Sequence, residues 1–279
     1  MIAALVIVFR EVLEAALVVG IVLAATRGLA GAGRWVGVGI AGGLGGATFV
    51  ALFAGSIADA LEGYGQEVFN AGVLLLAVAM LTWHNAWMTT HGRQMAQEMR
   101  EVGQAVQRGQ RPLAVLALVV GLSVLREGSE TVLFLYGLAT GEGGLSDALT
   151  GGALGLAIGF LAGSSLYLGL LRIPSRYLFS VTSWMITLLA AGMAAQAITF
   201  LSAADLLSIG EVLWDSSTIL SQESLPGRIL HTLIGYMDRP TSVQAAAYVA
   251  TLALIYGATL LASTLSRDTR RAPVTVRRE

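Results

Sequence analysis

Seven long apolar stretches constrain this chain more than any other feature of its sequence. Each has about 20 or more mostly apolar residues, the length that a helix needs to cross the hydrocarbon core of a bilayer. The stretches are residues 2–26, 35–58, 68–90, 113–140, 148–171, 177–201 and 243–265. Continuous apolar runs of this length argue against the alternating strands of a β-barrel. The predicted fold class is therefore an all-α integral membrane protein with seven transmembrane helices.

Composition supports this fold class and narrows the chemistry. Charged residues make up 13% of the chain, whereas soluble domains carry roughly 25%. The chain has no Cys, which excludes disulfides, thiolate metal sites and Cys nucleophiles. It also has no Lys, which excludes Schiff-base chemistry and a Walker-type phosphate loop. A net charge of −1 gives no case for binding nucleic acid.

The Arg residues predict an orientation, because cytoplasmic loops carry an excess of basic residues. Thirteen of the 17 Arg lie in one set of alternate connections and the tail, whereas the other set holds Arg228 and Arg239. The 13 are Arg27, Arg34, Arg93, Arg100, Arg108, Arg111, Arg172, Arg176, Arg267, Arg270, Arg271, Arg277 and Arg278. This partition predicts an extracytoplasmic N-terminus and a cytoplasmic C-terminus. The expected location is the cytoplasmic (inner) membrane.

We interpret residues 1–265 as one transmembrane domain and residues 266–279 as a cytoplasmic tail. Residues 92–112 carry mixed charges and few helix breakers, so they are predicted to form a cytoplasmic amphipathic helix. The outer loop, residues 202–242, contains two apolar-polar pieces. These pieces, around residues 206–214 and 226–236, are predicted to be short helices over the outer mouth, with Pro226 in the first turn of the second.

The chain contains an internal repeat. Residues 8–14 match residues 124–130 at an offset of 116, and each copy opens a set of three spans. Because three is odd, the second set enters the membrane from the opposite side. The sequence therefore predicts an inverted repeat, with repeat A at about 1–91, repeat B at about 113–201 and the span 243–265 added outside it. In transporters built this way, the binding site lies at the bilayer midplane between the halves.

Six charged residues lie inside membrane spans, near the middle of the first span of each repeat. They are Arg10, Glu11, Glu14, Arg126, Glu127 and Glu130. Each costs about 2.5–3.5 kcal/mol at a helix centre, so both segments are expected to face the bundle interior or a hydrated path. In each copy the two Glu are three residues apart and share a face, and the Arg precedes the second Glu by four residues. Antiparallel packing of the two segments would bring four carboxylates together.

This charge pattern favours a cation. Four carboxylates and two guanidinium groups leave a net charge of −2, which suits a di- or trivalent ion. Hard cations prefer oxygen ligands, and the chain has three His and no Cys. Iron is the leading candidate, and the two Arg can serve as permanent counter-charges when the ion leaves. The alternative is a pair of buried ion-pair networks that hold helices together, although such pairs are weak stabilisers.

The motifs Arg10-Glu11-x-x-Glu14 and Arg126-Glu127-Gly128-Ser129-Glu130 resemble the paired Arg-Glu-x-x-Glu motifs of the oxidase-dependent iron permeases. That family includes the fungal high-affinity iron permease and the bacterial iron-uptake permease. Further matches to the bacterial branch are Gly65-Gln66-Glu67, Leu81-Thr82-Trp83, Trp214-Asp215-Ser216-Ser217 and Leu233-Ile234-Gly235-Tyr236. One departure is Val12, which follows the first Glu where the family often has Gly.

The resemblance implies an iron permease with seven membrane helices that imports iron as the ferric ion. It further implies that the iron has been handled by a separate extracytoplasmic oxidase or peroxidase and an iron-binding protein. The implied iron ligands are Glu11, Glu14, Glu127 and Glu130, with Arg10 and Arg126 completing the motifs. Iron is then cargo, so no permanently bound cofactor is expected.

Several other residues are secondary candidates. Glu67, Glu211 and Asp215 are predicted outer entrance ligands, with a helix-end acid or a helix cap as the alternative. Other outer acids are interpreted as solvated groups that raise the local cation concentration. These are Asp59, Glu62, Glu142 and Asp147. His84 is a candidate for proton relay or metal contact, but the favoured interpretation is a hydrogen-bonded structural His.

Three other functions compete with iron transport. A transporter of another hard cation such as manganese fits the same carboxylates. A di-iron carboxylate enzyme also uses Glu-x-x-Glu helices, but it usually adds Glu-x-x-His ligands, and no His lies beside either motif in the sequence. A metal sensor would need a signalling domain, for which residues 266–279 are too short. The prediction is therefore a transporter that works by alternating access and is not an enzyme.

Overall fold

The computed structural model describes residues 1–61, 65–139, 144–169, 175–208 and 210–271. Most of these residues are helical, and the described part of the chain contains no strand, apart from an isolated bridge between Val212 and Thr241. The helices are α1 (Ile2–Ala25), α2 (Ala32–Leu61), α3 (Gln66–Gln107), α4 (Ala114–Ala139), α5 (Gly144–Tyr167), α6 (Ser175–Ala203), α7 (Leu225–Ile234) and α8 (Ser242–Arg271).

The helix lengths and surfaces are those of a membrane protein. In the described part of the chain, five helices are long and apolar enough to cross a bilayer, namely α2, α3, α5, α6 and α8. Helices α1 and α4 have 24 and 26 residues, which is about 36 and 39 Å of helix, but each carries three charged residues. Large apolar side chains on α2 and α5 face outward, such as Phe49 and Phe160, which are 70% and 65% exposed. The all-α membrane fold is therefore confirmed.

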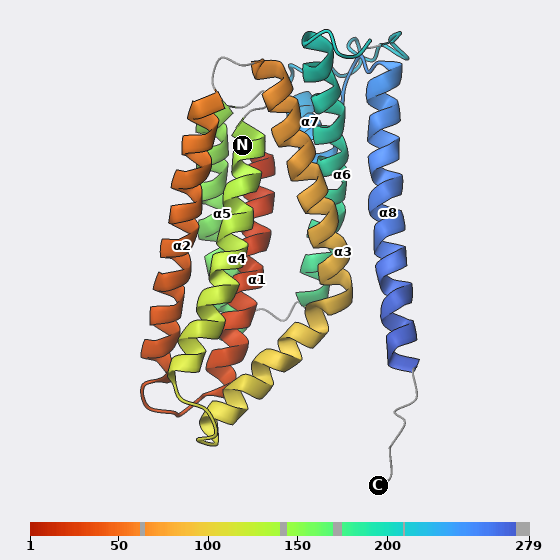
Figure 1. The fold of residues 1–279 in the computed structure, drawn as a ribbon. Coiled ribbons are helices and arrows are strands. Elements are labelled where there is room, and N and C mark those ends of the chain that lie inside the picture. The colour runs from red at the N-terminus through yellow and green to blue at the C-terminus, as the bar shows by residue number, and fades with distance from the viewer. Residues whose placement is uncertain (62–64, 140–143, 170–174, 209, 272–279) are drawn as a thin grey trace.

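The two helices that carry the repeated motif lie at the centre of one half of the bundle. Figure 1 shows α1 and α4 side by side, with α2 packed along α4 and α5 packed along α1. Helices α3 and α6 pack against each other, and α8 packs on α6 and α3. The N-terminus and α7 lie at one end of the bundle, and α8 ends at the opposite end (Figure 1). We call the α7 end the upper end and the other the lower end.

Glycines let the outer helices approach α1 and α4 closely. A Cβ atom placed on Gly43 of α2 would lie 2.8 Å from the carbonyl oxygen of Gly121 on α4. A Cβ on Gly155 of α5 would lie 2.5 Å from the carbonyl oxygen of Leu5 on α1. No side chain larger than hydrogen fits at these positions, which is the close packing that small residues allow between membrane helices. The Gly-rich second and fifth spans thereby fix the positions of the two motif helices.

Two apolar clusters flank the charged segments along the bundle axis. The upper cluster includes Ile7 of α1 and Phe134 of α4, both fully buried. The lower cluster includes Val22 of α1 together with Leu116 and Val120 of α4. The charged residues 10–14 and 126–130 lie between these clusters on both helices. The charges are therefore enclosed above and below by packed apolar side chains.

Three expectations about the connections have clear outcomes. The predicted amphipathic helix at 92–112 is helical to Gln107, but it continues directly from the preceding span as part of α3. The predicted helix at 226–236 is confirmed as α7, with Ser224 as its N-cap and Pro226 in its first turn. The predicted helix around 206–214 is wrong, because the described residues of that segment form turns and extended chain.

The physical reason for the missing helix lies just before the segment and at its middle. Asp205 and Gly210 have φ values of 58° and 77°, which belong to the left-handed region and interrupt a right-handed helix. Val212 then pairs with Thr241 as an antiparallel bridge. This pairing ties the start of the outer loop to the start of α8.

Candidate metal centre

The motif on α1 forms a buried, self-paired set of charges. The Nε atom of Arg10 lies 2.9 Å from Oε1 of Glu14, and its NH1 atom lies 3.9 Å from Oε1 of Glu11. All three residues are at most 4% exposed. The expected i, i+4 pairing is confirmed here. Because the pair is dehydrated, the attraction between its charges is weakly screened.

The motif on α4 repeats this pairing in a more open setting. The Nε atom of Arg126 lies 3.1 Å from Oε1 of Glu130 and 3.9 Å from Oε1 of Glu127. The Arg126 side chain is 30% exposed, and its Cζ atom lies 4.1 Å from the centroid of the Trp87 ring of α3. Arg126 is thus covered in part by this cation–π contact, whereas Arg10 is fully enclosed by the bundle. The two copies therefore share their ion pairs but differ in burial.

His84 of α3 joins the two motifs. Its Nε2 atom lies 3.6 Å from Oε2 of Glu14 and 4.0 Å from Oε2 of Glu11, and its Nδ1 atom contacts Oε2 of Glu130. The His84 side chain is 2% exposed. An imidazole therefore lies between carboxylates of α1 on one side and of α4 on the other. His84, a sequence candidate for proton relay or metal contact with a hydrogen-bonded structural His as the favoured interpretation, thus contacts the carboxylates of both motifs.

Four side chains offer donor atoms that fit around one ion. One ligand atom each from Glu11, His84, Glu127 and Glu130 lies within 4.8 Å of the others. Glu14 adjoins this group through His84. Both oxygens of Glu11, and one each of Glu14 and Glu127, are buried and receive no hydrogen bond from the described residues. Buried carboxylate oxygens without donors are costly, and a cation between them would remove that cost.

The three predicted entrance acids lie apart from this cluster. Glu67 is exposed in the first turn of α3, and 17 residues separate it from His84, about 26 Å along a helix. Glu211 is exposed, and its backbone carbonyl accepts a hydrogen bond from the amide of Ser242. Neither residue belongs to a metal-binding group of acids and His in the described chain.

Asp215 is occupied by contacts within the outer loop. Its Oδ1 atom accepts hydrogen bonds from the amide and hydroxyl of Ser217 at 3.0 and 2.6 Å. Its Oδ2 atom lies 3.0 Å from Nε of Arg239. Hydrogen bonds from Ser217, with Arg239 adding to them, lower the pKa of the Asp215 carboxyl to about 2. These contacts hold Asp215 against the turn at 217–219, and no helix follows it directly for the carboxylate to cap.

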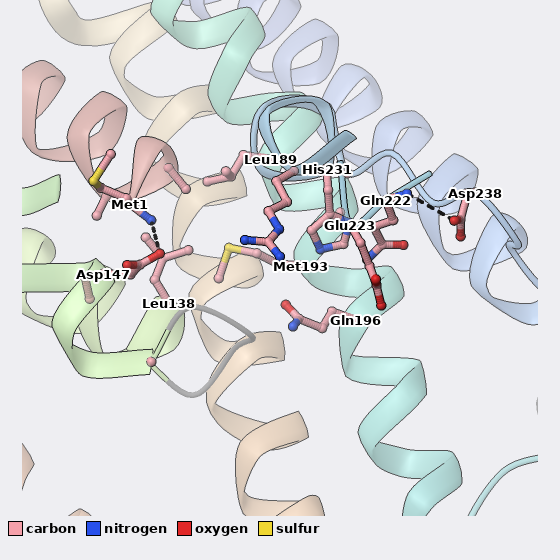
Figure 2. A pocket seen from close by; sticks show the side chains of 17 residues that line it. Met1, Leu138, Asp147, Leu189, Met193, Gln196, Gln222, Glu223, His231 and Asp238 are labelled. Atoms are coloured by element: carbon pink, nitrogen blue, oxygen red, sulfur yellow. Dashed lines mark hydrogen bonds and ion pairs between the residues drawn. The ribbon is translucent and has the colours of Figure 1, made fainter. Parts of the chain in front are cut away.

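A cavity of about 700 Å³ opens at the upper end of the bundle, below the outer loop. Figure 2 shows Asp147 and Met1 on one side of this upper cavity, and Glu223, His231 and Asp238 on the other. Asp147 pairs with the terminal amine of Met1 at 3.2 Å. Of the remaining predicted solvated acids, Glu62 and Glu142 lie outside the described residues, as does the side chain of Asp59.

Packed apolar side chains separate the upper cavity from the charged cluster. Ala3 and Met193 both line the cavity and belong to the upper apolar cluster. Ile7 lies one helical turn from Glu11, and Phe134 lies one turn from Glu130, and both are fully buried. The structure therefore holds the cluster closed toward the upper end.

His84 is the site residue whose position the sequence did not predict. One signal was present, because Thr82, His84 and Asn85 are polar residues in the middle of an apolar span, and such residues mark functional sites in membranes. No His lies beside either motif in the sequence, but His84 touches both motifs in space, so the absence of a neighbouring His does not by itself exclude a di-iron site.

Fold and site together define the class as an α-helical integral membrane protein with an acidic cluster inside the bundle. Residues 1–269 match the Iron permease FTR1 family, and the chain therefore belongs to that family. This membership confirms the family resemblance of the two Arg-Glu-x-x-Glu motifs and the prediction of an iron-transport protein, and it favours a permease over an enzyme.

Named relatives agree with the family match. The chain is 34% identical over 250 residues to the ferrous iron permease EfeU of Escherichia coli O6:H1, covering 87% of this chain and 89% of that protein. It is 33% identical over 247 residues to the ferrous iron permease EfeU of Shigella sonnei, covering 87% of this chain and 89% of that protein. No solved structure matches the chain.

Proposed function

We propose that this chain imports iron across the cytoplasmic membrane through the cluster of Glu11, Glu14, Glu127 and Glu130. The observation that carries the proposal is the meeting of both motifs in one buried place, where several carboxylate oxygens receive no hydrogen bond from the described residues. A partly dehydrated cation supplies the charge that these oxygens need. Iron is the transported cargo in this proposal, and no cofactor is permanently bound.

The proposed topology has seven membrane spans, α1 to α6 and α8, with the N-terminus outside and the C-terminus in the cytoplasm. Helices α1 and α4 are included because each exceeds the roughly 30 Å of hydrocarbon and its charges face the bundle interior. With both included, the number of spans is odd, which places the two termini on opposite sides of the membrane. The excess of Arg in the connections at the lower end of the bundle supports a cytoplasmic lower end. Residues 266–279 would then be a cytoplasmic tail.

An inverted repeat is part of the proposal, with repeat A at about 1–91, repeat B at about 113–201, an outer loop at 202–242 and the last span at 243–265. Packing supports it. The repeat relates α1 to α4 and α2 to α5. The contact between α1 and α5 therefore corresponds to the contact between α4 and α2, and both contacts are extensive. A pseudo-two-fold axis of this kind is common in transporters, where the halves rock around a central site.

The proposed transport cycle moves the ion between the two ends by alternating access. Acids of the upper cavity such as Glu223 and Asp238 attract the cation, and opening of the Ile7 and Phe134 layer admits it to the cluster. The carboxylates replace its waters. After release to the lower end, Arg10 and Arg126 balance the remaining negative charge through their Glu partners.

The oxidation state of the iron has two candidates. The ferric ion is expected from the family resemblance and from the number of hard carboxylate ligands. The ferrous ion is favoured by the imidazole of His84 in the cluster, because imidazole is a borderline donor that suits the borderline ferrous ion, whereas carboxylates alone suit harder ions such as the ferric ion. The relatives' names also specify ferrous iron. A separate oxidase or peroxidase and an iron-binding protein on the outer side are proposed partners for delivery.

Uptake into proteoliposomes tests the proposal. Purified protein is reconstituted, and accumulation of ferric citrate, of ascorbate-reduced ferrous ion and of manganous ion is compared with that of protein-free liposomes. The expected result is iron accumulation above the protein-free control in one oxidation state, with slower uptake of manganese. Manganese uptake without iron uptake would overturn the assignment of iron.

A further inference from the structure

Resting on the proposed function, we propose that His84 is a nitrogen ligand of the transported ion and sets the selectivity for iron over harder cations. His84 comes from α3, outside both repeated motifs, yet its ring lies between them. Among the acids and His of the described chain, it belongs to the group that can surround one ion.

The geometry gives the two ring nitrogens different tasks. Nε2 faces α1, at 3.6 Å from Glu14 and 4.0 Å from Glu11, whereas Nδ1 contacts Glu130 of α4. A neutral imidazole has one lone pair and one N–H group. One nitrogen can therefore bind the ion while the other donates its hydrogen to a carboxylate, which is the arrangement that orients metal-bound His in proteins.

The contacts of the His84 ring differ from the contacts that hold α3 against the rest of the bundle. The contacts recorded for the His84 ring in the described part of the chain are with motif carboxylates. Helix α3 is fixed in its place by other residues. The Nδ2 atom of Asn85 donates a hydrogen bond to Oγ1 of Thr187 on α6 at 3.1 Å, and Leu81 is buried in the upper apolar cluster.

The nitrogen donor also breaks the symmetry of the site. Helix α6 occupies the position equivalent to α3 in the proposed repeat, and its sequence from Ser175 to Ala203 contains no His, Asp, Glu or Cys. The carboxylates are thus contributed in matched pairs and the imidazole by one half. Carboxylates alone favour ions such as Mn²⁺ and Mg²⁺, whereas an imidazole raises the relative affinity for iron.

The selectivity test is competition between iron and Mn²⁺ for uptake into proteoliposomes, with iron in the oxidation state that the unchanged protein accepts. His84→Gln is expected to retain uptake but to lose about tenfold of its preference for iron over Mn²⁺, the lower range for loss of one metal-site contact. His91→Gln is the matched control on the same helix and keeps the original preference. An unchanged preference in His84→Gln overturns the proposal.

A binding measurement covers the case in which His84→Gln does not fold. The chain has three His, so changing His91 and His231 to Gln leaves His84 as the sole imidazole. Pulsed EPR of Mn²⁺ bound to this double variant is expected to show coupling to an imidazole nitrogen. Bound Mn²⁺ without that coupling overturns the role of His84. Failure of the unchanged protein to transport iron would instead count against the proposed function.

Discussion

The guanidinium of Arg10 and the carboxylate of Glu14 lie 2.9 Å apart, one helical turn from each other, in the enclosed middle of the bundle. Arg126 and Glu130 repeat this pair at 3.1 Å where the Arg side chain is 30% exposed. The same ion pair thus occurs in two environments that differ in exposure to solvent. The loss of stability on replacing each Arg can therefore be compared between the buried and the more exposed pair.

Arg10→Gln is expected to destabilise the protein more than Arg126→Gln. Removing one partner of a buried pair leaves an uncompensated charge and costs on the order of 3–5 kcal/mol, and Arg10 is 1% exposed. The cost at Arg126 is smaller because solvent screens part of its charge. Thermal unfolding in detergent without added metal measures the difference. An equal or larger loss for Arg126→Gln would contradict the described enclosure.

Gly155→Ala is expected to destabilise the bundle by roughly 1–3 kcal/mol, the usual range for overpacking. The added Cβ would lie 2.5 Å from the carbonyl oxygen of Leu5 and would push α5 away from α1. Gly37→Ala is the matched control, because nothing lies within 4 Å of its added Cβ. Chemical unfolding in mixed micelles compares the two variants. Equal stability of both would refute the close α1–α5 contact.

The proposed topology predicts which positions a membrane-impermeant thiol reagent can reach. The chain has no Cys, so each labelled variant reports one site. Ile219→Cys in the outer loop, at a position 89% exposed, is expected to react in spheroplasts. Gln110→Cys, between α3 and α4, should react after permeabilisation. The reverse pattern would invert the proposed orientation.

The contacts of Asp215 are expected to stabilise the outer loop only above a certain pH. The folded pKa of about 2 is below the ordinary Asp value of about 3.9, so its contribution to stability is complete above about pH 4 and is lost as the pH falls toward 2. Asp215→Asn should therefore speed proteolysis of the loop at pH 7. The unchanged loop should remain protected at pH 4. Equal cleavage of both proteins at pH 7 would show that the Ser217 and Arg239 contacts do not hold the loop.

Much of the fold could be predicted because the apolar spans encode their own helices. The segment 92–112 is predicted as a helix separate from the preceding span, but no Pro interrupts α3 and the helix runs on to Gln107. Residues 206–214 have an amphipathic pattern, but the backbone at Asp205 and Gly210 is left-handed. The spacing of apolar residues does not predict such a local backbone conformation.

The site could be predicted in part, for a related reason. Pairings within one helix, such as Arg10 with Glu14, follow from spacing alone. The contact of His84 with the motifs depends on how α3 packs against α1 and α4, over separations of more than 40 residues. Such a long-range contact cannot be predicted from the spacing of residues in one sequence. The same limit applies to Glu67, whose place at a helix start is correct but whose distance from the cluster required the structure.

The most direct test of the central claim is iron uptake by Glu14→Gln and Glu130→Gln in proteoliposomes. Each change removes one carboxylate charge from the cluster with little change in volume. Glu98→Gln is the matched control, since Glu98 is exposed on the lower part of α3. Both cluster variants are expected to lose at least about tenfold of the initial uptake rate, while the control keeps it. Near-normal uptake by both cluster variants would contradict a role for these carboxylates in iron transport.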